Sequence, residues 1–224
     1  MSFAVHADPW LSELMSRPVF RVDGGGEVSA IGDAPGFYFA KVATDRVADV
    51  TALATRGFSV VDTNVTFELL RDPGAPALPV TECSDADAEA VLAIAGSAFR
   101  YSRFHLDPQI SDDLANRIKR EWIANYTRKS RGDALLVAHL DGKPAGFLAA
   151  LKSHGTAVID LVAVATDAHG KGIGSALTAA FAQRYAGMPR LVGTQVANVP
   201  SIRLYTKLGF LLARSQYVLH RHVS

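Results

Sequence analysis

The 224-residue sequence has a single cysteine, so it offers no internal disulfide, and one thiol does not build a zinc site by itself. No run of about 20 consecutive apolar residues is present, which excludes a membrane helix, and the N-terminus lacks the basic start of a signal peptide. An excess of one charge is also missing, because 23 Lys plus Arg face 22 Asp plus Glu. We therefore predict a cytoplasmic protein without a metal, a membrane or a nucleic acid as partner.

The composition is that of an ordinary globular protein, with 49% hydrophobic and 20% charged residues, which excludes a disordered or low-complexity chain. The length allows one large domain or two small ones. Three prolines and a glycine gather in residues 71–79, a combination that predicts a connector. We therefore predict an N-terminal α/β part over 1–70 and a second domain over 80–224.

Hydrophobic periodicity predicts alternating strands and helices in both parts. The first part has strands over 17–22, 36–43 and 58–70, with a helix over 47–56. The second part has helices over 84–99, 111–128, 173–185 and 200–208, and strands over 134–140, 145–152, 156–165, 191–197 and 210–220. The pair Asp141-Gly142 predicts a hairpin turn with positive φ. The fold class is α/β (α+β), a mixed sheet covered by helices.

Two segments, 53–58 and 204–210, each leave a helix through Gly-Phe and enter a strand. A degenerate internal repeat explains this similarity, and so does a commonly used corner between a helix and a strand.

Residues 160–175 read DLVAVATDAHGKGIGS, a buried strand that passes through a glycine-rich turn into a helix. Glycines let the backbone approach a ligand closely, and the free N–H groups of a helix start favour an anion. The spacing fits neither a P-loop nor a dinucleotide fingerprint. The turn therefore predicts a pyrophosphate site, with a simple tight turn as the alternative.

The turn 169–174 and the strand valine Val164 resemble the acyl-CoA loop of the GCN5-related N-acetyltransferases. A second block of that family is similar to the segment from Asn198 to Phe210. The resemblance implies the family fold over about 80–220, acetyl-CoA as acyl donor and a small-molecule amine as acceptor. The residues it assigns to the donor are Val162, Ala163, Val164, His169, Gly170, Lys171, Gly172, Ile173, Gly174, Ser175, Asn198 and Ser201.

His169 stands where the family has Arg or Gln, and a neutral imidazole donates one hydrogen bond where a guanidinium donates several. We expect a phosphate contact from His169, at lower affinity. The resemblance also implies that Tyr205 is the general acid; the alternative is an aromatic on the buried face of its helix. Asn198 is expected to bind the pantetheine arm or to cap that helix.

The general base stays open between His105, His154, Asp160, Glu68 and a chain of water molecules.

The loop 98–111 is expected to shape the acceptor site, because the family places the acceptor between its first two helices. Its candidate acceptor residues are aromatic or basic, suited to stacking on a ring and pairing with phosphate: Tyr101, Arg103, Phe104 and His105. The alternative is a surface loop whose aromatics pack beside Trp122.

Short stretches along the whole chain, among them 53–61, 97–104 and 121–123, resemble the TDP-fucosamine acetyltransferases. This similarity implies an amino sugar linked to a nucleotide as acceptor. Two alternatives remain: another small amine, amino acid or antibiotic as acceptor, or a non-catalytic CoA-binding module. Exposed sheet edges are compatible with a homodimer.

Overall fold

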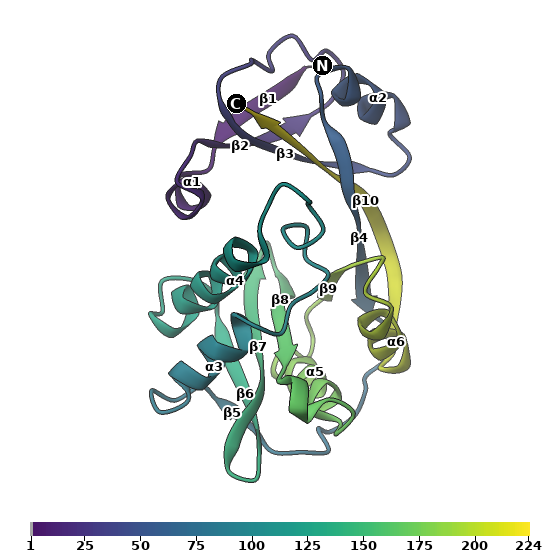
Figure 1. Cartoon of the computed structure of the whole chain (residues 1–224). Helices are drawn as coiled ribbons and strands as arrows, with labels where there is room; N and C mark the ends of the chain where they lie inside the picture. The colour runs from purple at the N-terminus through teal and green to yellow at the C-terminus, as the bar shows by residue number, and fades with distance from the viewer. Residues whose placement is uncertain (1) are drawn as a thin grey trace.

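The computed structural model describes residues 2–224 as two lobes that share one ten-stranded sheet (Figure 1). The N-terminal lobe consists of β1 (Phe3–Ala7), α1 (Pro9–Met15), β2 (Val19–Gly24), β3 (Gly36–Ala43) and α2 (Val47–Thr55). The C-terminal lobe contains α3 to α6 and β5 to β9. The long strands β4 (Ser59–Leu69) and β10 (Phe210–Val223) run through both lobes. The strand order is β1-β2-β3-β10-β4-β9-β8-β7-β6-β5.

The middle of the sheet has an internal symmetry. The units β3-α2-β4 and β9-α6-β10 have the same order of elements. Their last strands, β4 and β10, pair with each other, and each also pairs with the first strand of the other unit, β4 with β9 and β10 with β3, all antiparallel. Each unit turns from its helix through a glycine with positive φ, Gly57 at 80° and Gly209 at 90°, and a phenylalanine follows both. This arrangement places β4 between β9 and β10, although β4 precedes the connector 71–79. The predicted domain boundary at 71–79 stays a prediction. Strand β4, which precedes it, pairs with β9 of the C-terminal lobe, and β10, which follows it, pairs with β3 of the N-terminal lobe.

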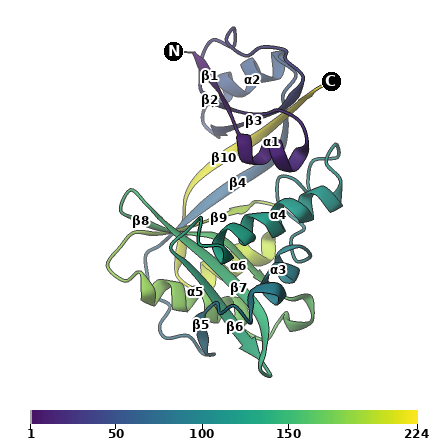
Figure 2. The same ribbon diagram turned by 90° about the vertical axis from the view of Figure 1, so that its left-hand side faces the viewer.

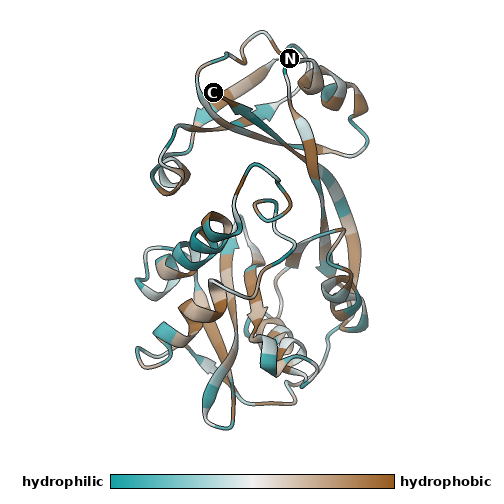
Figure 3. Cartoon of the chain, viewed as in Figure 1, coloured by the Kyte–Doolittle hydropathy of each residue, from teal (hydrophilic) through white to brown (hydrophobic). Residues whose placement is uncertain are grey.

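In the C-terminal lobe, helices cover both faces of the sheet (Figure 2). On one face α3 (Ala88–Ala95) and α4 (Asp112–Thr127) pack over β6 (Ala134–Leu140) and β7 (Lys143–Ser153), with Ile123 and Phe147 in that core. On the other face α5 (Ile173–Arg184) buries Leu177 and Phe181, next to α6 (Val199–Lys207). Figure 3 shows hydrophobic residues along the central strands of this lobe and alternating hydrophilic and hydrophobic residues along α4. The remaining strands are β5 (Val80–Glu82), β8 (Thr156–Val164) and β9 (Arg190–Gln195).

The predicted α+β class is confirmed, as is the hairpin between β6 and β7, where Asp141 and Gly142 have φ of 51° and 75°. The expectation for the first 35 residues was wrong in omitting β1 and α1, and β5 was also missed. Helix α1 has only seven residues and depends on a cap, since Asp8 Oδ1 accepts from Leu11 N at 3.0 Å. Such short elements carry too little periodicity to predict. Within residues 2–224, no helix is both long and apolar enough to span a membrane.

Candidate functional site

The sheet opens between its two parallel neighbours β8 and β9. They pair only from Ala157 with Arg190 to Ile159 with Val192. Beyond this point β8 continues to Val164 on β7, while β9 continues to Gln195 on β4. The β8 edge over 160–164 therefore faces a gap and offers free backbone N–H and C=O groups. The predicted residues Val162, Ala163 and Val164 all lie on this edge.

The glycine turn follows directly. Gly170 and Gly172 adopt φ of 76° and 79°, which an L side chain rarely does, and α5 begins at Ile173. Among residues 2–224, no group accepts a hydrogen bond from the backbone N–H groups of 170–175. These donors sit at the positive end of the α5 dipole. The turn therefore has free N–H donors that can bind a multiply charged anion such as a diphosphate.

His169 makes a contact that the sequence did not indicate. Its Nε2 lies 3.1 Å from the carbonyl oxygen of Val164, so the Nε2–H donates to β8. The single N–H of the neutral ring is thereby used within the chain. In this structure His169 ties the start of the turn to the free edge of β8, and its predicted contact with phosphate stays a prediction.

Tyr205 on α6 is buried, with 2% of its surface exposed, and its ring lies between those of Phe67 and Phe210 at centroid distances of 6.2 and 5.7 Å. Burial raises the pKa of Tyr205 well above its usual value, with a small opposing effect of Ser201. Its hydroxyl thus keeps its proton at neutral pH. Asn198 caps α6, because its Oδ1 accepts from Ser201 N at 3.3 Å, as the capping alternative expected.

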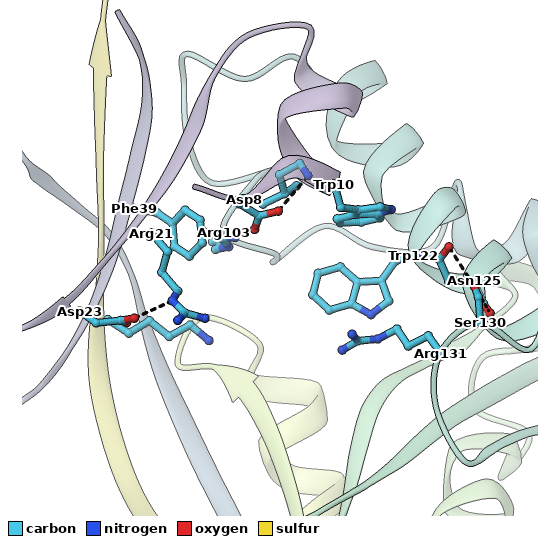
Figure 4. Close-up of a pocket in the computed structure, with 12 residues that line it drawn as sticks. Asp8, Trp10, Arg21, Asp23, Phe39, Arg103, Trp122, Asn125, Ser130 and Arg131 are labelled. Carbon is cyan, nitrogen blue, oxygen red and sulfur yellow. Dashed lines mark hydrogen bonds and ion pairs between the residues drawn. The ribbon is translucent and has the colours of Figure 1, made fainter. Parts of the chain in front are cut away.

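A cavity of about 690 Å³ lies between the lobes (Figure 4). Trp122 of α4 and Arg131 form one wall, and Arg21 of β2 and Phe39 of β3 face them. The indole of Trp10 meets that of Trp122 edge to face, with centroids 5.6 Å apart and planes at 84°. The cavity thus combines flat aromatic surfaces with several cationic groups.

Two cations of the cavity wall, Lys41 and Arg103, form no ion pair with the described residues. Arg21 pairs with Asp23 at 2.7 Å and Arg131 with Asp160 at 2.9 Å. By contrast, no carboxylate oxygen of residues 2–224 lies within 4.0 Å of a side-chain nitrogen of Lys41 or Arg103.

Desolvation lowers the pKa of Lys41 and that of Arg103, the latter to about 10. Lys119 of α4 adds a third cation, over the rings of Phe99 and Trp122 at 5.0 and 5.2 Å. Burial lowers its pKa to about 8. An anionic ligand would relieve this concentration of positive charge.

Of the four residues predicted to bind the acceptor, the structure brings only Arg103 to the cavity. Tyr101 is exposed on the surface of its loop. Phe104 is 1% exposed and belongs to the core beneath α4, as the packing alternative expected. His105 hydrogen-bonds locally, Nδ1 to Ser102 Oγ at 2.6 Å and Nε2 to Asn116 Oδ1 at 3.0 Å. The loop folds inward because burying a phenylalanine is more favourable than leaving it exposed.

Two further candidates for the general base, Asp160 and His154, also have defined places in the structure. Asp160 is the bulged residue of β8 and accepts from Trp122 Nε1 at 2.9 Å, Tyr126 Oη at 2.7 Å and Arg131 Nε at 2.9 Å. Its lone pairs are therefore largely used. His154 is exposed in the turn between β7 and β8.

Sequence reasoning missed Asp62 of β4, which is only 6% exposed. Neither carboxylate oxygen has a hydrogen-bond partner within residues 2–224. Burial raises its pKa to about 6, and the nearby Thr63 N–H, Lys41, Gln195 and Arg103 oppose that rise. Asp62 pairs with Val218, which pairs with Lys41, so both charged side chains lie on the sheet face toward the cavity. An acidic residue inside an apolar strand was the signal available in the sequence.

The opened pair of parallel strands, the free N–H groups at the start of α5 and the α+β class together suit an acyltransferase. Residues 92–210, over half of the chain, match the acetyltransferase (GNAT) family. The chain therefore belongs to this family, which confirms the predicted family and enzyme class.

Two curated relatives have names that concern sugars. The spore coat polysaccharide biosynthesis protein SpsD of Bacillus subtilis is 34% identical over 137 residues, 60% of this chain and 47% of that protein. The chain thus spans about half of its length. The dTDP-fucosamine acetyltransferase of Escherichia coli O6:H1 is 29% identical over 198 residues, 81% of this chain and 80% of that protein.

Solved structures share the fold at low identity. A protein of unknown function from Staphylococcus epidermidis has a TM-score of 0.65 at 16% identity, over 84% of this chain and 73% of that chain. A tandem GNAT protein from the clavulanic acid biosynthesis pathway has a TM-score of 0.62 at 16% identity, over 92% of this chain and 75% of that one.

Proposed function

We propose that the chain is an acetyl-CoA-dependent N-acetyltransferase that acts on the amino group of a nucleotide-linked amino sugar. The observation that carries the proposal is the pairing of two sites: the free N–H groups of 170–175 beside the open edge of β8, and the aromatic, cationic cavity between the lobes.

The donor side fits coenzyme A by its chemistry. The N–H groups of the turn suit a diphosphate, and the backbone groups left free on the open edge of β8 suit the amides of a pantetheine arm. Such a donor supplies an acetyl thioester, whose C–S bond breaks while a C–N bond to the acceptor forms. Two protons must also move: one leaves the acceptor ammonium for a base before the nitrogen attacks, and a second leaves the nitrogen as the C–N bond forms and replaces the proton that an acid gives to the sulfur.

The chain has groups for both protons. Tyr205 keeps its O–H at neutral pH, because burial raises its pKa, and donates that proton toward the sulfur. Asp62 is ionised at neutral pH with a pKa of about 6, has unused lone pairs, and lies beside Gln195 at the end of β9, where the sheet opens. It takes the proton of the acceptor ammonium, directly or through one water molecule.

The acceptor side fits a nucleoside diphosphate sugar. A volume of about 690 Å³ lies within the usual range for small-molecule sites. The indoles of Trp10 and Trp122 offer surfaces for a base, while Lys41 and Arg103 carry charge for a diphosphate. The names of both curated relatives concern carbohydrates, which supports the same acceptor class.

A CoA-release assay tests the proposal with four acceptors: a dTDP-linked amino sugar, the same amino sugar without its nucleotide, a polyamine and an amino acid. The expected result is turnover with the nucleotide-linked sugar and at least 100-fold lower kcat/KM without the nucleotide. Equal turnover of the polyamine or amino acid would replace the acceptor class. Binding of acetyl-CoA without turnover of any acceptor would point to a non-catalytic module.

A further inference from the structure

A row of five side chains leads from the protein surface to the cavity, in the order Arg17, His222, Asp107, His220, Arg103. Arg17 Nη2 lies 2.8 Å from His222 Nδ1, and His222 Nε2 lies 2.8 Å from Asp107 Oδ2. His220 Nδ1 is 2.7 Å from the same oxygen, and Arg103 Nη1 is 3.4 Å from His220 Nε2. Asp107 and His220 are each only 2% exposed.

The two arginines determine where the imidazole protons lie. A guanidinium only donates hydrogen bonds, so His222 Nδ1 and His220 Nε2 must both accept. Each neutral ring then carries its proton on the other nitrogen, and both N–H groups donate to Asp107 Oδ2.

The charges of the row agree with this assignment. Burial lowers the pKa of His220 to about 4, which keeps the ring neutral. Burial also acts to raise the pKa of Asp107, but hydrogen bonds from His220, His222 and Gln109 N–H outweigh it and hold that pKa well below its usual range.

The cluster of Asp107, His220 and His222 has the composition of a metal site, with ligand atoms within 4.8 Å of one another. Coordination through His220 Nδ1 and His222 Nε2 would move both imidazole protons to the far nitrogens. Each far nitrogen would then point an N–H at the N–H of an arginine. A cation here would cost both arginine contacts, so the row favours hydrogen bonding over coordination.

We propose that Asp107, His222 and His220 are positioning residues that hold Arg103 in the cavity as a binding group for the diphosphate of a nucleotide ligand. The aromatic rings of Phe39 and Phe104 lie 4.0 and 4.4 Å from the guanidinium carbon of Arg103 and restrict its plane.

The one carboxylate of the row is separated from Arg103 by a neutral imidazole, and Arg17 compensates it at the far end. Arg103 is thus fixed in place while its charge remains available to a ligand. A directly bonded carboxylate would neutralise it instead. The inference rests on the proposed nucleotide-linked acceptor.

Calorimetric titration with dTDP and with inorganic pyrophosphate tests the inference on the full chain, with acetyl-CoA as the reference ligand. Arg103→Gln and Asp107→Asn should each weaken dTDP binding at least 10-fold and leave acetyl-CoA binding within twofold. In the Arg103→Gln background, Asp107→Asn should have no further effect on dTDP, because both act through one group. Asp113→Asn, at an exposed position of α4, is the matched control.

Substitutions of His220 separate positioning from mere packing. In His220→Gln the amide donates to Asp107 and its oxygen accepts from Arg103, so dTDP affinity should stay within threefold. His220→Phe fills the space without either bond and should lose at least 10-fold. Nitrogen NMR should show His220 protonated at Nδ1 and not titrating between pH 6 and 8.

Three results would overturn the inference: a proton on Nε2 of His220, unchanged dTDP affinity in Asp107→Asn, or no binding of dTDP and pyrophosphate to the wild-type chain. The CoA-release assay decides the acetyl transfer independently of these measurements.

Discussion

Replacing Asp62 by Asn should stabilise the protein and impair the reaction at the same time. Burial raises the pKa of Asp62 from 3.8 to about 6, so the folded state binds this proton more tightly than the unfolded state. Below about pH 4, Asp62 is protonated in the folded and in the unfolded state, and its burial carries no charge. As the pH rises from about 4 to about 6, the unfolded state ionises first, so the free energy of unfolding falls. A difference of about two pKa units corresponds to a loss of about 3 kcal/mol in unfolding free energy at pH 7 and above.

The asparagine resembles the neutral acid and has no charge to desolvate. The gain in unfolding free energy should therefore be small at pH 4 and reach about 1–3 kcal/mol at pH 7.5. Urea unfolding followed by tryptophan fluorescence at both pH values measures it, with the exposed Asp45→Asn as control. Turnover should fall at least 100-fold, because the variant cannot take the proton of the ammonium.

A variant that is no more stable than the wild type at pH 7.5, or whose gain is the same at pH 4 and pH 7.5, would refute the pKa argument. Unchanged turnover would instead refute the role of Asp62 as base and leave the stability argument intact.

Three further predictions concern the donor side. Tyr205→Phe should lower turnover by about 100-fold or more while acetyl-CoA affinity by calorimetry stays nearly constant, and equal loss of both would make Tyr205 structural. Gly172→Ala should lose about 1–2 kcal/mol of stability from its positive φ and also weaken acetyl-CoA binding; Gly74→Ala, with a similar φ and equally open surroundings, should lose only stability. His169→Arg should tighten acetyl-CoA binding because a guanidinium adds donors, and unchanged or weaker binding by calorimetry would show that His169 does not contact the phosphates.

The sequence alone was sufficient for features that depend on neighbouring residues. The glycine turn at 170–174, the start of α5 and the hairpin at Asp141-Gly142 are set by local backbone preferences and short-range hydrogen bonds. The apolar periodicity of α4 and α5 likewise predicts their buried faces. For this reason the order of the residues is enough to predict the position of the proposed donor site.

The cavity proposed for the acceptor depended on tertiary structure. The cavity joins β2 and β3 to α4 and the loop around Arg103. The strands β4 and β10, which run through both lobes, place Asp62 on the same sheet face as Lys41 and His220 behind Arg103. Phe104 and Arg103 are adjacent in sequence, yet one enters the core and the other the cavity. Packing between distant segments decides such choices, because burial and desolvation depend on what covers a side chain and not on its neighbours along the chain.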